Sequence, residues 1–331
     1  MPNLITLEDK VCVCELNRPH AMNSIDPEMR EELFAFYERM KSDNDIHVII
    51  FTGAGDKAFC TGADLKKTMP DTNVSYAQQL LGEGDPGSAF KGLETDKPII
   101  CAVNGYALAG GTELLCACDI AIASENAKFG LSEVKRGSIP WGGSIQRLPH
   151  SISKSDAMLL LLTGDVIDAQ EALRMGLVSK VVPHKELMPT AIELGRRIAK
   201  NAPLAVRAIK QLVTRGQDMP LVHALQVDKY MYGLLKTRAV ALETLNQGIT
   251  CNAICPGSVL TPNVETRVLA LMQERGLERD AAVRIFLAGK QPIQRFVESE
   301  HVADLLVFLC GPAGRDITGA MLPVEGGLLA S

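Results

Sequence analysis

The chain of 331 residues alternates short apolar runs with amphipathic stretches from its N-terminus to about residue 236. Residues 11–17 (VCVCELN) alternate as in a half-buried strand, and 47–53 (HVIIFTG) form the continuous apolar run of a buried strand. Between them, 27–43 has helical periodicity behind a proline. Residues 98–124 then predict a strand, a glycine-rich turn, a short apolar helix and another strand. Because strands and helices alternate, the pattern predicts the α/β class.

Four further helices follow in the pattern, with the short strand LVSKVVP between the second and the third. They are predicted at about 153–162, 168–175, 185–200 and 203–216. The polar, glycine-containing stretch from Met69 to Leu93 is longer than an ordinary connection, which predicts a mobile loop beside a site.

The composition is that of a soluble globular protein, with 47% hydrophobic and 22% charged residues. A net charge of -5 and the absence of a stripe of Lys and Arg interleaved with aromatics argue against a nucleic-acid partner. The N-terminal sequence lacks the features of a signal peptide, and no apolar run is long enough to span a membrane. We therefore expect a cytoplasmic protein with no membrane partner.

Neither a metal site nor a nucleotide site is indicated. The cysteines sit mostly inside apolar runs, as Cys12 and Cys14 do, and the six histidines show no ligand spacing. The turn Gly53–Ala58 nearly spells the dinucleotide fingerprint GxGxxA, which requires a helix that starts within the turn. The residues that follow, Phe59–Gly62, instead run into a second turn, so we expect no dinucleotide there.

Two glycine-rich turns carry candidate chemistry. In KAFCTGADLKK (57–67), Gly62 lets the backbone approach a ligand and Asp64 begins a predicted helix. In NGYALAGGTELL (104–115), Gly110 opens a helix whose first N–H groups have no partner within the helix. Fixed N–H donors suit a reaction in which a thioester carbonyl oxygen takes up negative charge. Taken singly, each turn is as easily explained by backbone geometry alone.

The two turns and the segments after them resemble the enoyl-CoA hydratase, or crotonase, family. The pattern AF-x-x-GADL at 58–65, NGYALAGGTEL at 104–114 and the long segment at 118–149 occur in the order and spacing of that family. The resemblance runs from Val11 to about Leu235. It implies a spiral of strand–strand–helix repeats over a core of about 1–190, followed by a helical region of about 191–236.

The resemblance also implies how an acyl-CoA thioester would be held. The residues that match Ala63 and Gly110 give the two backbone donors of an oxyanion hole. The residues that border the bound acyl-CoA match Ala63, Asp64, Leu65, Lys66 and Gly110. Coenzyme A is part of the substrate, no other cofactor is implied, and members of the family assemble as homotrimers, often paired into hexamers.

Hydratases of this family use two glutamates, which match Glu113 and Glu133. The implied reaction adds water across the Cα=Cβ bond, with Glu113 as general base and Glu133 as the donor of the proton to Cα. Taken alone, Glu113 is explained as a carboxylate in the first turn of its helix, and Glu133 as a surface ion pair with Lys135 or Arg136. Relatives with one acid shift double bonds, so an isomerase is the alternative within the family.

The C-terminal part resembles a different family. Residues 241–266 and 303–327 are similar to the end of the short-chain dehydrogenases, most closely the 3-hydroxybutyrate dehydrogenases. A second enzyme is therefore one interpretation. However, no glycine-rich cofactor turn precedes this piece, no catalytic serine segment is recognisable, and Tyr232 and Lys236 lie closer to the turn at Pro256 than that family places its tyrosine and lysine.

The two resemblances join near Lys236, which predicts a fusion of a crotonase-like domain, 1–236, with a partial Rossmann-type fragment, 237–331. The late helical segment that reaches the CoA pocket in the first family has no match here. Strands predicted at 249–254 and 319–325 lack the other strands of their sheet, and unpaired strand edges invite association or disorder. A catalytically weak acyl-CoA-binding scaffold is therefore a further alternative to a hydratase.

Overall fold

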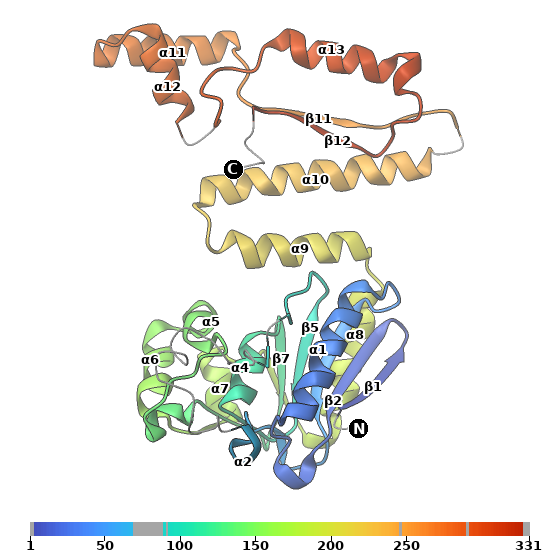
Figure 1. Cartoon of the computed structure of the whole chain (residues 1–331), viewed down its shortest axis with the longest axis vertical. Helices are drawn as coiled ribbons and strands as arrows, with labels where there is room; N and C mark the ends of the chain where they lie inside the picture. The colour runs from blue at the N-terminus through green and yellow to red at the C-terminus, as the bar shows by residue number, and fades with distance from the viewer. Residues whose placement is uncertain (1–2, 69–88, 91, 245–246, 289–290, 327–331) are drawn as a thin grey trace. The chain divides into compact units, whose positions relative to one another are not determined.

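The structure, a computed structural model, describes residues 3–68, 89–90, 92–244, 247–288 and 291–326 (Figure 1). Most of the loop expected from Met69 to Leu93 lies outside these residues. The chain divides into two compact units, Met1–Gln211 and Leu212–Ser331. Strands and helices alternate through the first unit, which confirms the α/β class.

A six-stranded sheet forms the centre of the first unit, in the order β1-β2-β3-β5-β7-β10. Its strands are β1 (Asn3–Glu8), β2 (Val11–Leu16), β3 (Val48–Gly53), β5 (Ile99–Val103), β7 (Ile120–Ser124) and β10 (Lys180–Val182). All neighbouring strands are parallel except β1 and β2. The sequence pattern did not predict β1, because every residue of this edge strand except Asn3 is exposed and leaves no alternation of apolar positions.

A second sheet consists of short strands in the order β4-β6-β8-β9. Its strands are β4 (Ala58–Cys60), β6 (Tyr106–Leu108), β8 (Lys128–Gly130) and β9 (Ile167–Asp168). The chain passes from β3 to β4, from β5 to β6 and from β7 to β8, and helices α2 (Leu65–Thr68) and α4 (Gly110–Cys116) follow β4 and β6. These strand–strand–helix repeats are the spiral that the sequence predicts.

The remaining helices of this unit agree with the sequence pattern to within a few residues. They are α1 (Pro27–Ser42), α5 (Ser144–Ser151), α6 (Lys154–Thr163), α7 (Ala169–Met175), α8 (Leu187–Ala199) and α9 (Pro203–Gly216), which crosses into the second unit. Only α5 was not expected. Side chains cap three of them: Asp26, Ser153 and Asp168 each accept a hydrogen bond from a backbone N–H of the first turn.

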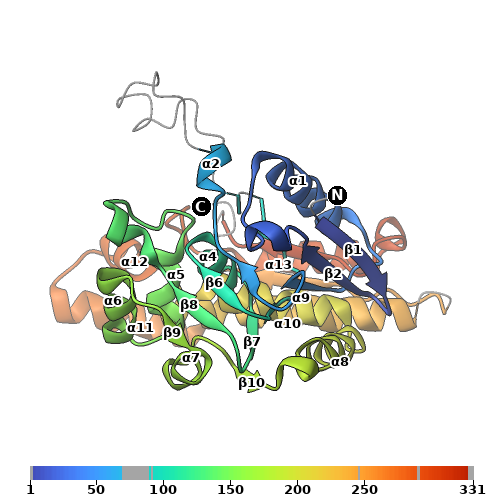
Figure 2. The same cartoon turned by 90° about the horizontal axis from the view of Figure 1, so that it is seen from below.

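Both faces of the central strands of the large sheet, such as β3 and β5, are buried. Figure 2 shows α1 and α8 on opposite sides of β2. On the α1 side, the ring of Phe51 on β3 meets Phe36 edge-on, with 6.0 Å between centroids, and Tyr37 at 6.5 Å. On the α8 side, Val11 and Ile50 pack with Leu187 and other apolar residues. Central strands buried on two faces explain the continuous apolar run of β3.

The turn that nearly spells a dinucleotide fingerprint is closed by asparagine side chains. The amide of Asn104 donates to the carbonyls of Gly53 at 2.8 Å and Gly55 at 2.7 Å, and its oxygen accepts from the Gly53 N–H at 3.2 Å. The amide of Asn23 donates to the Ala58 carbonyl at 2.7 Å. Strand β4, which the sequence pattern did not predict, follows this turn where the dinucleotide fingerprint requires a helix.

The second unit contains a two-stranded parallel sheet and its helices. The elements wholly within it are α10 (Leu221–Glu243), β11 (Ala253–Pro256), α11 (Pro262–Arg275), α12 (Arg279–Leu287), α13 (Ser299–Cys310) and β12 (Met321–Val324). Among the residues described, β11 and β12 pair only with each other. Of the strand predicted at 249–254, only the last two residues are in β11. Cys251 and Asn252 are held instead by hydrogen bonds that involve Thr318 and the Ile317 carbonyl.

Candidate active site

The two glycine-rich turns singled out in the sequence touch each other. A Cβ atom placed on Gly62 would lie 2.8 Å from the Gly110 nitrogen, and one on Gly110 would lie 3.0 Å from the Gly62 Cα. Gly62 also has a φ of +83°, a conformation that favours glycine. The contact therefore excludes a side chain at Gly62, and it brings the N–H of Ala63 and the N–H of Gly110 into one region.

These two N–H groups are available to a ligand. A bridge to Ile25 uses the groups on either side of Ala63: the Ile25 N–H donates to the Gly62 carbonyl at 2.8 Å, and the Asp64 N–H donates to the Ile25 carbonyl at 2.9 Å. Gly110 is the first residue of α4. Neither the Ala63 N–H nor the Gly110 N–H donates a hydrogen bond within the part of the chain that the structure describes.

Ala109 sets the direction of the Gly110 N–H, and sequence analysis missed it. Its φ of 50° and ψ of −121° lie in a region that is costly for a residue with a side chain, about 1–3 kcal/mol. Its own N–H donates to the Gly130 carbonyl at 2.9 Å, and the Thr112 hydroxyl donates to the Ala107 carbonyl at 2.6 Å. These bonds hold the strained peptide between Ala109 and Gly110. No signal in the sequence marks an alanine for this conformation.

Glu113 follows Gly110 on α4 and is buried, with 5% of its surface exposed. Its Oε1 accepts hydrogen bonds from the Gly142 N–H at 2.7 Å and the Ser144 hydroxyl at 3.0 Å. Burial raises the pKa of Glu113, against the opposing effects of those two donors and of Arg147. The carboxyl is therefore oriented by two donors and is a stronger base than an exposed glutamate.

Glu133 lies in the 3₁₀ turn Ser132–Arg136 and differs from Glu113 in its surroundings. Its Oε2 is buried and has no hydrogen-bond partner among the described residues. Burial raises the pKa of Glu133 and the negative charge of Glu113 raises it further, against the opposing effects of the Glu133 backbone N–H and of Arg136. The expected surface pair with Lys135 is not formed, because the Lys135 ammonium pairs with Asp165 at 2.8 Å, and Arg136 acts on Glu133 only through its charge.

Two residues beside Glu113 were also missed as site residues, although they lie within the matched segment 118–149. A Cβ on Gly142 would lie 2.8 Å from the Glu113 Oε2 and 2.9 Å from the ring of Phe90. Ser144, the first residue of α5, is fully buried against the carboxylate. Glycine at 142 is thus required by the packing of this loop on Glu113 and Phe90.

Four of the five residues expected to border the acyl-CoA follow one another from Ala63 to Lys66, at the start of α2, and the fifth, Gly110, begins α4. Ala63, Leu65 and Lys66 are exposed, whereas the Asp64 carboxylate is turned to Arg18, with 2.9 Å between its Oδ2 and the Arg18 Nη2. A cavity of about 250 Å³ occurs elsewhere, beside Lys97, Arg207 and the α8–α9 connection, and none of the site residues lines it. No group of three His, Cys, Asp or Glu suited to a metal occurs among the described residues.

Comparison with known proteins decides the family. A profile described as "Enoyl-CoA hydratase/isomerase" matches residues 6–248. The chain belongs to this family. A second profile, described as "Enoyl-(Acyl carrier protein) reductase", matches residues 233–329, so the family member is fused to a C-terminal segment of another family. The two matches overlap on α10, so a boundary at Lys236 stays a prediction.

The matches between this family member and its curated relatives cover most of the length of each relative. The (E)-benzylidenesuccinyl-CoA hydratase of Thauera aromatica is 45% identical over 236 residues, which is 71% of this chain and 91% of the relative. The short-chain-enoyl-CoA hydratase of Clostridium acetobutylicum is 40% identical over 233 residues, 70% of this chain and 87% of the relative. These relatives are hydro-lyases, and so is this enoyl-CoA hydratase family member.

Solved structures confirm the fold of this family member. The crystal structure of an enoyl-CoA hydratase from Bacillus anthracis superposes with a TM-score of 0.67 at 36% identity, and the match covers 76% of this chain and 98% of that one. An enoyl-CoA hydratase subunit from Geobacillus kaustophilus gives a TM-score of 0.66 at 31% identity, and the match covers 76% of this chain and 97% of that one.

In the described residues, no helix is long and apolar enough to cross a membrane.

The hydrogen bond from Ser144 generates a prediction for the hydratase. Because the Ser144 hydroxyl stabilises the ionised form of Glu113, Ser144→Ala should raise the pKa of Glu113 further. When the pH is lowered, a carboxylate with a raised pKa becomes protonated at a higher pH than one with an ordinary pKa. The acid limb of the kcat/KM profile should therefore move to higher pH, and kcat/KM at pH 7 should fall on the order of threefold. Ser138→Ala, at an exposed position of the same loop, should leave the profile unchanged. An unshifted acid limb in Ser144→Ala would contradict the assignment of Glu113 as the base.

Proposed function

We propose that the chain hydrates 2-enoyl-CoA thioesters at the site formed by the turns of Gly62 and Gly110 and the carboxyls of Glu113 and Glu133. The observation that carries the proposal is that two glutamates with raised pKa values belong to this site, the buried Glu113 and the partly buried Glu133. Glu113 lies one turn of helix beyond the Gly110 N–H, which donates no hydrogen bond among the described residues. Two acids support hydration over double-bond isomerisation, which needs only one.

The N–H groups of Ala63 and Gly110 are proposed to hold the thioester oxygen. When water adds to Cβ, the electrons of the Cα=Cβ bond move toward that oxygen, which becomes an enolate. Donors that are already fixed in place stabilise this charge without reorganisation in the transition state. The bridge to Ile25 and the strained peptide after Ala109 provide that rigidity.

The different surroundings of the two glutamates support different roles. Glu113 accepts two hydrogen bonds that favour its ionised form, so it is assigned to take a proton from the attacking water. The Glu133 Oε2 has no hydrogen-bond partner among the described residues, and Glu133 experiences the charge of Glu113; both features favour its protonated form. Glu133 is assigned to deliver its own carboxyl proton to Cα as the enolate collapses. The step leaves Glu113 protonated and Glu133 ionised, and both carboxyls regain their starting states by proton exchange with water.

The proposal leaves the acyl group open within the class of 2-enoyl-CoA thioesters. The relatives include a benzylidenesuccinyl-CoA hydratase and a short-chain-enoyl-CoA hydratase, whose names indicate different acyl groups. Coenzyme A enters as part of the substrate, and no other cofactor is proposed. A cytoplasmic location is likewise part of the proposal.

Replacing each glutamate by its amide tests the two-acid mechanism. Glu113→Gln and Glu133→Gln should each lower the hydration rate of crotonyl-CoA by about a hundredfold or more, because an amide cannot transfer the proton. Hydration is followed as loss of absorbance of the conjugated thioester, and binding by calorimetry with the product thioester should change little. Glu193→Gln, exposed on α8, is the matched control. Near-native turnover in either site variant would refute the mechanism, and an inactive wild type that still binds acyl-CoA would favour a binding scaffold.

A dehydrogenase function for the C-terminal segment is not proposed. Tyr232 and Lys236 both lie on α10, where the Lys236 ammonium is 5.4 Å from the Tyr232 ring centroid and Tyr232 is 63% exposed. We expect no NADH binding at micromolar concentrations, measured by nucleotide fluorescence, and no oxidation of 3-hydroxybutyrate. Saturable binding of NADH would revive the interpretation as a bifunctional enzyme.

A homotrimer, or a hexamer of two trimers, is proposed from the family resemblance. The free edges of β11 and β12 further predict that the C-terminal segment is cleaved first by protease. Limited proteolysis followed by size exclusion with light scattering should give a trimeric product that ends near Gly216. A monomeric product, or a C-terminal segment as resistant as the rest, would show that this segment is a structural part of the oligomer.

A further inference from the structure

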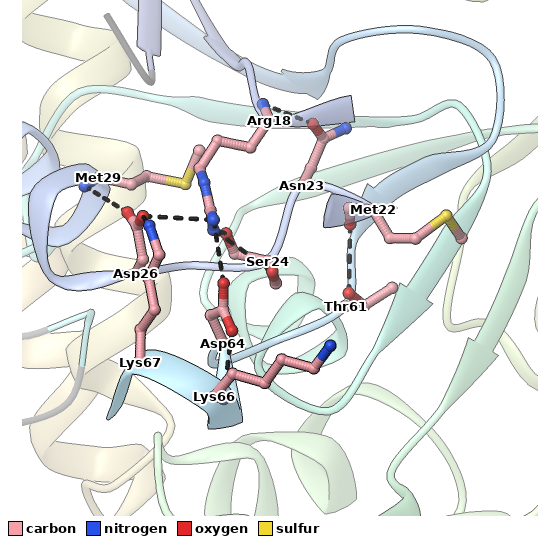
Figure 3. A network of polar contacts seen from close by, with 10 residues as sticks. All are labelled: Arg18, Met22, Asn23, Ser24, Asp26, Met29, Thr61, Asp64, Lys66 and Lys67. Carbon is pink, nitrogen blue, oxygen red and sulfur yellow. Dashed lines mark hydrogen bonds and ion pairs between the residues drawn. The ribbon is translucent and has the colours of Figure 1, made fainter. Parts of the chain in front are cut away.

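Arg18 is a buried cation between two carboxylates. Its side chain is 8% exposed, and its Nη2 lies 2.9 Å from the Asp64 Oδ2 and 3.3 Å from the Asp26 Oδ2 (Figure 3). Asp26 is 3% exposed and Asp64 14%. Buried ion pairs contribute little net stability, since the loss of hydration offsets the attraction. The arrangement therefore calls for an explanation in what it holds in place.

The Arg18 side chain is itself fixed by the turn that follows it. The Arg18 N–H donates to the Asn23 side-chain oxygen at 2.9 Å, and its guanidinium donates to the Ser24 carbonyl. The Asn23 amide in turn donates to the carbonyls of Ala54 and Ala58, at the base of β4. The guanidinium is thus tied through its own turn to the strand that leads into the Gly62 turn.

Asp64 connects this cation to the proposed oxyanion hole. It directly follows Ala63, and both its backbone and its side chain are held: the N–H by the Ile25 carbonyl at 2.9 Å, the carboxylate by Arg18. The peptide that carries the Ala63 N–H lies between Gly62, whose carbonyl accepts from Ile25, and this doubly held residue. Movement of Asp64 would therefore move the Ala63 donor.

Asp26 completes the network on the other side. It caps α1 by accepting from the Met29 N–H at 3.0 Å, and it pairs with the Lys67 ammonium of α2 at 2.7 Å. Burial by itself would raise the pKa of Asp26, but Lys67, the Met29 N–H and Arg18 outweigh it and lower the pKa. The carboxylates of Asp26 and Asp64 share one guanidinium nitrogen of Arg18. Without Arg18 they would face each other, and Lys67 would be the cation nearest to Asp26.

We propose that Arg18 is a positioning residue for catalysis, which acts through Asp64 to hold the Ala63 N–H in the geometry that binds the enolate oxygen. This inference rests on the proposed function. A donor that binds the transition state more strongly than the substrate affects kcat more than KM. Small displacements of such donors are costly, up to about a hundredfold in rate for 1 Å.

The test compares Arg18→Gln, Arg18→Lys and Asp64→Asn with wild type, using crotonyl-CoA. Arg18→Gln and Asp64→Asn should lower kcat by about tenfold to a hundredfold and change KM less than about threefold. Arg18→Lys keeps the charge but not the planar fork, so its kcat should be intermediate. Arg39→Gln removes an exposed pair with Asp43 on α1 and is the matched control with wild-type kinetics.

A spectroscopic readout separates positioning from stability. The infrared carbonyl stretch of bound, ¹³C-labelled 3-hydroxybutyryl-CoA should shift to lower frequency in wild type, since N–H donors polarise the carbonyl. The shift should be smaller in Arg18→Gln and Asp64→Asn, whereas a loss of folded protein alone would reduce the signal without changing its frequency. If Arg18→Gln does not fold, Asp64→Asn, which preserves the shape of the side chain, carries the test.

The outcomes distinguish the two proposals. Wild type that neither hydrates crotonyl-CoA nor shifts the carbonyl stretch refutes the proposed function. Wild type that does both, together with folded Arg18 and Asp64 variants that keep the kcat and the carbonyl frequency of wild type, overturns the positioning role while the proposed function stands.

Discussion

The close approach of two backbone turns is the constraint on which the site depends. Gly62 and Gly110 lie so close that no side chain fits at Gly62, and this contact alone brings the amides of Ala63 and Gly110 into one region. Parallel strands β4 and β6, which precede the two turns, place them side by side. The Asn104 side chain, which donates to the Gly53 carbonyl, links the turn before β6 to the turn before β4.

Buried polar groups concentrate around this contact, and they have two kinds of surroundings. The carboxyl of Glu113 and the Oε2 atom of Glu133 are buried without a cation at hydrogen-bond distance among the described residues, and burial raises the pKa of both groups. The carboxyls of Asp26 and Asp64 are buried against Arg18. The first pair is suited to exchange protons, whereas the second holds a stable charge distribution. The same low dielectric that makes burial costly strengthens the donors of the oxyanion hole.

The junction of the two families is marked by an uninterrupted helix. Helix α10 runs from Leu221 to Glu243, through the residues where both family matches overlap. Beyond it, β11 and β12 keep the parallel pairing expected of a dehydrogenase end, although no other strand of such a sheet accompanies them in the described residues. The helices of this segment pack around a small apolar cluster that includes Val268 and Phe296.

The sequence by itself determined the α/β class, most helices, the strands of the large sheet except β1, and the family, and it singled out the two glutamates, because periodicity and motif spacing are local properties of the chain. Its periodicity did not reveal strand β1, helix α5, the strands β4, β6, β8 and β9 or the φ of Ala109, since an exposed edge strand, strands of two or three residues and a strained alanine leave no local pattern. Only the tertiary structure showed that Gly142 and Ser144 orient Glu113, that the Glu133 Oε2 has no hydrogen-bond partner among the described residues and that Arg18 holds Asp64. Each of these depends on contacts between residues far apart in the chain, which no short-range pattern encodes.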